Sequence, residues 1–279
     1  MQPSTGPIAA RNLVVGLIGF LTLVDLFAAQ AILPTLAAHY RVTPAAMGLA
    51  VNASTVGMAV AALITALVSH RLPRRTGIWI ALAVLAAPTT ALAVAPDLAV
   101  FTALRVTQGL CMSVAFTLTM AYLAEHASAE EAAGALAAYV TGVVASNLFG
   151  RLIASNVAGA LGVAANFYVF AGLNLAGAAL TFAVLQKAPL AVHAEAGPSA
   201  LKRLATHLAT PCLRACFGIG FCVLFAFIGA FTYVNFVLAR TPLSLTPMAL
   251  GLVYFVFAPS MLTTPLAGAV ANRFGPRPT

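Results

Sequence analysis

The chain has 279 residues, of which 62% are hydrophobic and only 7% are charged, and its mean hydropathy is +1.00. A soluble domain carries about 25% charged residues, so this composition excludes a soluble enzyme, a disulfide scaffold and a disordered tail and predicts a chain solvated by lipid. The fourteen lysine and arginine residues exceed the six aspartate and glutamate residues, which in such a chain indicates basic cytoplasmic loops and no nucleic-acid binding.

Eight apolar runs follow one another along the chain, separated by charges, prolines and glycine-rich turns. A helix needs about 20 apolar residues to cross the hydrocarbon core of a bilayer. These runs therefore predict an all-α, polytopic membrane protein. The expected spans are 12–35, 48–69, 77–95, 98–124, 132–158, 166–186, 213–238 and 248–271.

The spans fall into two unequal groups. Residues 1–186 are expected to form a six-helix transmembrane half, 187–210 a polar cytoplasmic linker, and 211–279 a partial second half with spans 7 and 8. Residues 43–49 (T-P-A-A-M-G-L) and 246–252 (T-P-M-A-L-G-L) open spans 2 and 8 in the same orientation. This similarity indicates a parallel internal repeat, a known transporter design.

The distribution of positive charge sets the expected orientation. With the N-terminus inside, ten of the fourteen lysine and arginine residues lie on the cytoplasmic side, and Arg41 and Arg240 alone lie outside. Arg105 and Arg151 fall within spans. We therefore expect a multi-pass protein of the inner (plasma) membrane with both termini in the cytoplasm.

Two kinds of motif connect these spans to a known family. Span 4 carries Arg105, Gln108 and Gly109 in the pattern R-x-x-Q-G, and spans 2 and 8 both end in a basic turn. The matching positions in the turns are Arg71, Arg74 and Arg75, and then Gly268, Arg273, Gly275 and Arg277. On these motifs the chain resembles the major facilitator superfamily, although both turns lack the acidic residue of the family pattern.

Residues 30–34 and 147–152 look most like the drug:proton antiporter branch of that family, including its sugar-efflux-like members. The resemblance implies a major facilitator-type bundle, here with a complete N-terminal six-helix half and two helices of the C-terminal half. It also implies a secondary active transporter, with proton-coupled efflux of small organic molecules or drugs and with the basic turns as cytoplasmic gate loops. Small molecules, protons and the lipid bilayer are then the expected partners.

The family has twelve spans, and truncation after span 8 is the simplest account of this shorter chain. The alternative function is a non-transporting membrane fragment, or a half-transporter that needs a second chain to supply the missing helices. The two motif acids that are absent favour this alternative. Both hypotheses remain open at this point.

Asp25 and Arg105 are the candidate proton-coupling residues. An acid within a span costs about 2.5–3.5 kcal/mol on insertion scales, so Asp25 requires a pocket or a charged partner. Its functional interpretation is a carboxylate that binds a proton, and the alternative is an acid that stays protonated or lies near water. Arg105 keeps its charge, so it would act on a nearby acid, or it would anchor the backbone of a neighbouring helix.

The candidate substrate cavity comprises Asn147 and Arg151 in span 5 and Tyr233 and Asn235 in span 7. Asn147 would alternatively bridge helices, and the aromatic residues of span 7 would alternatively belong to the interfacial belt. The sequence contains no phosphate-binding loop, no H-E-x-x-H motif and no cysteine pattern for a metal. We therefore expect no enzyme activity, no catalytic residue, no cofactor and no metal.

Overall fold

The computed structural model describes residues 8–69, 72–125, 129–186 and 200–260, together with residues 263 and 266. These described residues form helices and connecting turns without a strand. The helices are α1 (Ile8–Ala31), α2 (Leu33–Tyr40), α3 (Pro44–Val68), α4 (Arg74–Leu92), α5 (Leu98–Glu125), α6 (Ala129–Leu161), α7 (Val163–Val184), α8 (Ala200–Ala209), α9 (Pro211–Leu238) and α10 (Pro247–Val253), followed by the 3₁₀ helix η2 (Tyr254–Phe257).

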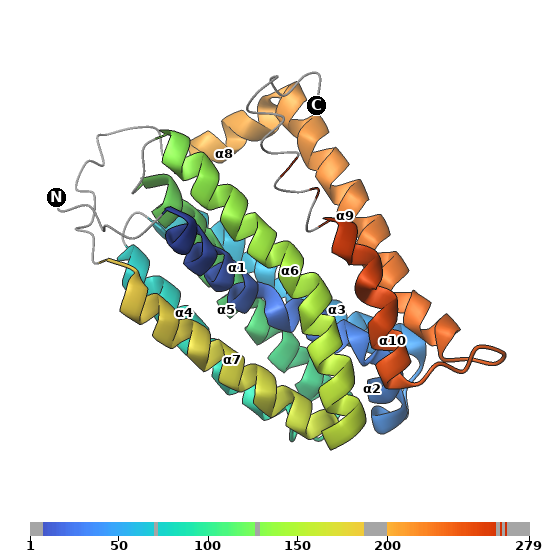
Figure 1. The fold of residues 1–279 in the computed structure, drawn as a ribbon. Helices are drawn as coiled ribbons and strands as arrows, with labels where there is room; N and C mark the ends of the chain where they lie inside the picture. Colours follow the sequence, from blue (N-terminus) through green and yellow to red (C-terminus); the bar gives the residue numbers. More distant parts are fainter. Residues whose placement is uncertain are drawn as a thin grey trace.

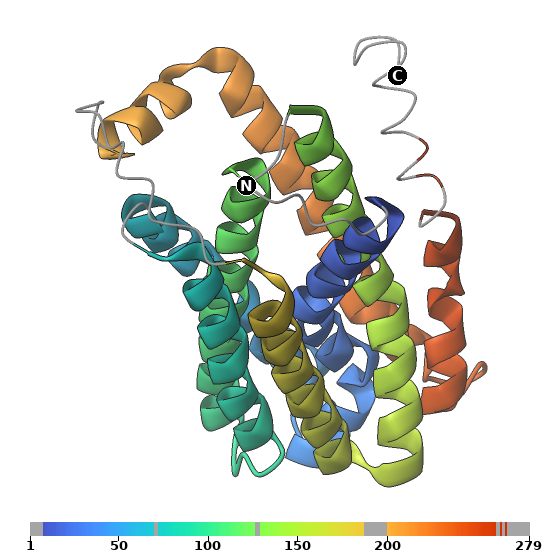
Figure 2. The same cartoon turned by 60° about the vertical axis from the view of Figure 1, so that its left-hand side comes forward.

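Seven of these helices, α1, α3 to α7 and α9, are long and apolar enough to cross a membrane. Helices α1 and α3 to α7 form one bundle, and α9 and α10 lie beside it (Figure 1). The most extensive helix pairs are α1 with α6, α3 with α5, and α4 with both α5 and α7, as Figure 2 shows from a second side. The expected six-helix half is thus present as one packed unit.

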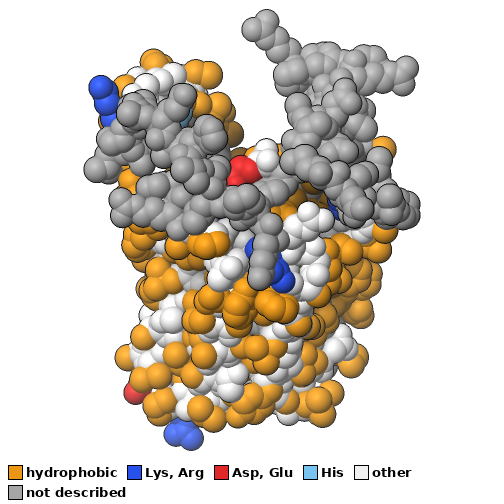
Figure 3. Space-filling view, turned by 90° about the vertical axis from the view of Figure 1, so that its left-hand side faces the viewer, with side chains coloured by type: hydrophobic (Ala, Val, Ile, Leu, Met, Phe, Trp, Pro, Cys, Tyr) orange, Lys and Arg blue, Asp and Glu red, His pale blue; other side chains and the backbone are white. Residues whose placement is uncertain are grey.

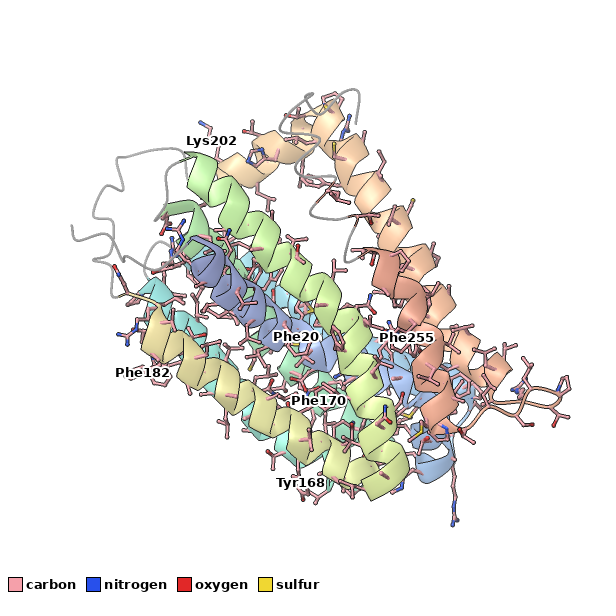
Figure 4. The ribbon with its side chains drawn as sticks, in the orientation of Figure 1. Phe20, Tyr168, Phe170, Phe182, Lys202 and Phe255 are labelled. Atoms are coloured by element: carbon pink, nitrogen blue, oxygen red, sulfur yellow. The ribbon has the colours of Figure 1, made fainter. Side chains whose placement is uncertain are left out.

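Hydrophobic side chains are spread over the face of the bundle that Figure 3 shows. Neighbouring residues of α7 illustrate how one helix serves both lipid and core: the Tyr168 side chain is half exposed and the Phe170 side chain is buried (Figure 4). Since a bilayer replaces water around such a surface, exposed apolar side chains are the expected state here.

Glycine allows a very close helix approach between α3 and α5, as it also does between α1 and α6 at Gly142. A Cβ atom at Gly109 would collide with the backbone oxygen of Ser54, and one at Gly57 would collide with the backbone oxygen of Val106. Small residues permit this approach in membrane helices generally. The glycine of the R-x-x-Q-G motif therefore has a packing role, and it brings Ser54 within reach of Arg105.

We expect Gly109→Ala to destabilise the bundle by about 1–3 kcal/mol, because overpacking against backbone atoms cannot be relieved by a side-chain rotation. The measurement is thermal unfolding of the purified chain in detergent. Gly172→Ala on α7 is the matched control, since a Cβ atom there meets nothing within 4 Å; it should be neutral or stabilising by up to about 1 kcal/mol. Equal unfolding of the two variants would contradict the packing role.

The structure corrects the end of the first expected span. The helix does not continue to residue 35: α1 ends at Ala31, and α2 begins at Leu33 with Pro34 in its first turn. Proline has no N–H group to continue a helix but suits the start of one. Helix α2 then ends at Tyr40, and the next residue, Arg41, caps it with a left-handed backbone and a φ of 55°.

The expected linker and the last span are described only in part. Residues 200–209 of the expected linker 187–210 form α8, so this stretch is not a simple polar connection. Of the expected span 248–271, the structure describes a helical stretch as far as Ser260, and residues beyond it lie largely outside the described set. The domain boundaries 1–186, 187–210 and 211–279 remain predictions.

The buried residues of helix α9 lie near its C-terminal end. From Pro211 to Ala226 its side chains are exposed, apart from the half-buried Leu213, whereas Thr232, Asn235 and Phe236 are buried. The contacts between the two expected halves are therefore concentrated where α9 ends and α10 begins.

Candidate functional site

Arg105 on α5 is the centre of a buried polar cluster. Its side chain is 1% exposed, and its Nε donates to the backbone oxygen of Val51 at 3.0 Å. Its Nη1 donates to the side chain of Gln108 at 2.6 Å and to the backbone oxygen of Asp25 at 3.3 Å, and its Nη2 donates to the hydroxyl of Ser54 at 2.9 Å. Arg105 therefore connects α5 with α1 and α3.

Gln108 extends this cluster to two more helices. Its Nε2 donates to the Thr89 hydroxyl on α4 at 2.7 Å, and Asn174 on α7 donates to the same hydroxyl at 3.1 Å. The Thr89 hydroxyl itself donates to the backbone oxygen of Leu85 at 2.8 Å. Five helices, α1, α3, α4, α5 and α7, thus share one hydrogen-bonded network, which we call the Arg105 network.

The Asp25 carboxyl group lies beside the Arg105 network but is incompletely paired. The side chain is 3% exposed and interacts electrostatically with Asn174 and Arg105. Its Oδ2 atom has no hydrogen-bond partner among the described residues. Arg105 donates to the backbone oxygen of Asp25, and the four hydrogen bonds of the Arg105 side chain given above do not reach the carboxyl group. A buried carboxyl group with an open oxygen is a position at which a proton can bind.

A second polar cluster joins the six-helix half to α9. The side chain of Gln30 on α1 donates to Asn52 on α3 at 2.9 Å, and Asn52 donates to the Thr232 hydroxyl on α9 at 2.9 Å. Asn235 on α9 donates to the backbone oxygen of Gln30 at 2.8 Å. It also accepts a hydrogen bond from the Tyr254 hydroxyl at 2.8 Å. We call this set the inter-half cluster.

Arg151 on α6 completes the inter-half cluster. Its Nη2 donates to Gln30 at 2.7 Å, and its side chain is fully buried at 0% exposure. Aromatic rings surround the guanidinium group, with ring centroids between 4.3 and 5.6 Å from Cζ. They belong to Phe27, Phe231, Tyr254 and Phe257.

The hydrogen bond between Asn52 and Thr232 joins a side chain of α3 directly to a side chain of α9. A double-mutant cycle with Asn52→Ala and Thr232→Val is expected to give a coupling energy of about 0.5–1.5 kcal/mol, the usual net value of a neutral hydrogen bond. The measurement is equilibrium unfolding in detergent. The control is a second cycle with Asn156→Ala and Thr232→Val, since Asn156 bonds within its own helix to Leu152. A coupling energy of the same size in this control cycle would contradict a specific contact between Asn52 and Thr232.

Two of the expected gate arginines make contacts inside the six-helix half. Arg74 at the start of α4 forms a two-pronged ion pair with Glu125 at the end of α5, at 2.7 and 3.0 Å. The Arg75 guanidinium lies 4.6 Å from the ring centroid of Phe182 and donates to the backbone oxygen of that residue on α7 (Figure 4). The other expected gate residues lie outside the described residues: Arg71, Gly268, Arg273, Gly275 and Arg277.

The structure brings some of the sequence-predicted residues together and separates others. Asp25, Arg105 and Gln108 lie in one cluster, and Arg151 and Asn235 lie in the other. Tyr233 does not join them, because its side chain is 44% exposed.

Sequence reasoning missed several neutral polar residues. They are Gln30, Asn52, Thr89, Asn174, Thr232 and Tyr254, which complete the two clusters. The signal that could have found the amides is their occurrence within apolar spans, where a polar side chain requires a partner.

The sequence also matches a family model over nearly its whole length. Residues 15–279 match the model of the Major Facilitator Superfamily. The chain belongs to this superfamily. The proteins similar to this chain include an uncharacterized transporter of Buchnera aphidicola subsp. Schizaphis graminum, with 24% identity over 260 residues, covering 92% of this chain and 62% of the relative. The inner membrane transport protein YnfM of Escherichia coli is 24% identical over 268 residues, covering 93% of this chain and 63% of YnfM.

Solved structures confirm the major facilitator fold. A bacterial homolog of the human lysosomal transporter Spinster, in an inward-facing and unoccupied conformation, matches with a TM-score of 0.79 at 15% identity, covering 98% of this chain and 64% of that structure. The proton:xylose symporter XylE matches with a TM-score of 0.69 at 19% identity, covering 97% and 70%. The chain spans less than two thirds of the length of the two curated relatives named above.

Proposed function

We propose that this chain acts in proton-coupled secondary transport, with efflux of small organic molecules across the inner (plasma) membrane. The observation that carries the proposal is the buried, incompletely paired carboxyl group of Asp25 beside the Arg105 network. Ionisable groups at membrane depth are rare and costly, and they mark proton or ion pathways. The assignment of the chain to the drug:proton antiporter branch belongs to the same proposal.

The Arg105 network suggests how protonation of Asp25 acts on the protein. Arg105 remains charged, so it attracts Asp25 while the carboxyl group is ionised and no longer does so when a proton is bound. The network connects five helices, so a change at Asp25 alters the preferred arrangement of several helices at once. A transporter needs an element with two stable arrangements. Binding of a proton or substrate then shifts the population toward one of these arrangements.

The inter-half cluster would be the part that separates and re-forms during transport. Substrate sites of such transporters lie near the bilayer midplane between the two repeats. Asn147 and Arg151 on α6 and Asn235 on α9 form the proposed substrate-binding region. Tyr233 is exposed beside Gly48 and would border that region. The gate role of the two basic turns remains a prediction, as do the cytoplasmic termini.

A second candidate is that the chain functions only with a second polypeptide that supplies further helices. The exposure of α9 favours it, because Phe221 and Phe225 are 67% and 72% exposed. Lipid would cover this surface equally well. The two possibilities therefore differ in the mass of the purified protein, which is larger when a second polypeptide is bound. Native mass spectrometry of the purified protein tests them: a stable complex with another membrane polypeptide supports the second candidate, and the mass of this chain alone contradicts it.

The test of proton coupling uses the chain reconstituted in liposomes that contain a pH-sensitive dye. An imposed pH gradient is monitored while ethidium, arabinose or 4-hydroxybenzoate is added as a cationic, neutral or anionic probe. We expect at least one probe to accelerate proton movement over protein-free liposomes. Liposomes that contain monodisperse protein but show no response to any probe would overturn proton-coupled transport by this chain.

A further inference from the structure

One face of α6 carries three polar residues with unmet hydrogen-bonding capacity. Asn147, Arg151 and Ser155 are four residues apart and therefore lie on the same side of the helix, about 6 Å from one to the next. The unpaired buried atoms are Oδ1 of Asn147, Nε and Nη1 of Arg151, and Oγ of Ser155. Polar atoms buried at membrane depth without partners are costly. The stripe therefore requires an explanation beyond helix packing.

Arg151 is the member with the largest unmet demand. A guanidinium group has five N–H donors. The Nη2 atom of Arg151 donates to Gln30 and the group also interacts electrostatically with Tyr254, whereas Nε and Nη1 have no hydrogen-bond partner among the described residues. The four surrounding rings stabilise a positive charge through their faces, but they supply no negative counter-charge. No carboxylate pairs with Arg151 within 4 Å in the part of the chain that the structure describes. A buried charge of this kind is favourable only when an opposite charge or further hydrogen bonds compensate its lost hydration.

The unpaired donors lie where the two parts of the molecule meet. Phe27 belongs to α1, Phe231 to α9, and Tyr254 and Phe257 to η2. Figure 1 shows α9 and α10 alongside this side of the bundle. A movement of α9 and η2 away from α1 and α6 would therefore open the environment of Arg151 first. A ligand could therefore reach Arg151 when α9 and η2 have moved away, and would be enclosed when they return.

We propose that the substrate is a small organic anion whose carboxylate group binds to the free N–H donors of Arg151. This inference rests on the transport function proposed above and specifies its substrate class. Guanidinium groups bind carboxylates through two parallel hydrogen bonds, a match of geometry as well as charge. The rings around Arg151 offer an apolar surface for the body of the molecule. A cationic substrate would be repelled by Arg151, and a neutral one would leave its charge uncompensated.

The other two members of the stripe refine this class. The Oδ1 atom of Asn147 accepts hydrogen bonds only, so it calls for a donor on the ligand. It lies one helical step, about 6 Å, from Arg151. A hydroxyl or amino group about that far from the carboxylate would satisfy it. Ser155 packs against Gly251 of α10, so its hydroxyl would become available when α10 moves.

The first experiment measures thermal unfolding of the purified chain with 4-hydroxybenzoate as the probe. Its carboxylate and hydroxyl groups stand at opposite ends of one ring, as the stripe requires. We expect a saturable rise in Tm, and a much smaller rise with 4-hydroxybenzamide, which lacks only the charge. Sodium chloride at the same ionic strength separates carboxylate binding from a general anion effect. No rise with 4-hydroxybenzoate, or an equal rise with the amide or with chloride, would overturn the proposal.

Variants locate the effect. Arg151→Gln should abolish the rise in Tm, and Arg151→Lys, which keeps the charge without the planar fork, should weaken apparent binding roughly tenfold or more. Arg240→Gln makes the same change at an exposed position and should bind like the original chain. Size-exclusion chromatography checks that every variant is folded, and Arg151→Lys provides the test if Arg151→Gln is not. Binding that persists undiminished in the folded Arg151 variants would overturn the assignment.

The liposome assay separates this inference from the proposed function. If ethidium or arabinose drives proton movement while 4-hydroxybenzoate neither binds nor acts, the substrate class is wrong and proton-coupled transport stands. If 4-hydroxybenzoate binds through Arg151 but no probe moves protons, the anion site stands and proton coupling fails.

Discussion

Replacing Asp25 with asparagine is expected to reduce proton-driven transport to the background of protein-free liposomes. The amide cannot exchange a proton at neutral pH, yet it has nearly the same size and keeps hydrogen-bonding capacity for Asn174 and Arg105. Membrane insertion should be retained or improved, because the variant removes an ionisable group from a buried position. The measurement is proton movement in dye-loaded liposomes, together with the yield of monodisperse protein.

Asp97→Asn is the matched control for this experiment. Asp97 is exposed, and its carboxylate accepts a hydrogen bond from the backbone N–H of Val100 at the start of α5. Asparagine caps helices as well as aspartate does, so this variant makes the same chemical change without consequence for folding or for transport. Proton-driven transport at the original rate in Asp25→Asn would remove Asp25 from the mechanism, whatever the control shows.

The second large effect is expected at Arg105, where a substitution should lower the free energy of unfolding of the bundle. Arg105→Met keeps the length of the side chain but leaves Gln108, Ser54 and two backbone oxygens without their donor, and it leaves Asp25 without its positive neighbour. Removal of one member of a buried charged network typically costs about 3–5 kcal/mol. We expect a loss of this size in the free energy of unfolding, measured with denaturant in mixed micelles.

Two further variants separate the loss of hydrogen bonds from the loss of charge. Arg105→Lys keeps the charge but offers fewer, differently directed donors, so its stability should lie between those of Arg105→Met and the original chain. Arg240→Met at an exposed position should change stability by no more than about 0.5 kcal/mol. If Arg105→Met unfolds like the Arg240 variant, the Arg105 network does not stabilise the fold.

The helices of the six-helix half were predictable because each follows from a local property of the sequence. Apolar length alone separates α3, α4, α5 and α7 from their neighbours, and the expected spans agree with them within a few residues. The first span was wrong at its end, since the apolar run continues through residue 35 while Pro34 starts a new helix. Length and hydropathy do not detect a break that leaves the chain apolar.

The candidate site was predictable only where charge made it conspicuous. Asp25 and Arg105 stand out because charged residues are rare within spans, and the structure places them together. Asn52, Thr232 and Tyr254 could not be paired from the sequence, because their partners depend on how α9 lies against α1 and α3. The depth of Arg151 could not be predicted either, because it depends on where the helix ends. Helix α6 extends through Leu161, beyond the expected end of the span.

The two polar clusters have one helix in common. Asp25 and Gln30 both belong to α1 and are separated by five residues, or about 7.5 Å along the helix axis. Gln30 contacts Asn52, Arg151 and Asn235. Because a helix moves as a stiff rod over so short a distance, a displacement of α1 at the Asp25 carboxyl group also displaces Gln30 and its contacts with α9. Communication between the two clusters therefore needs no relay of intervening side chains.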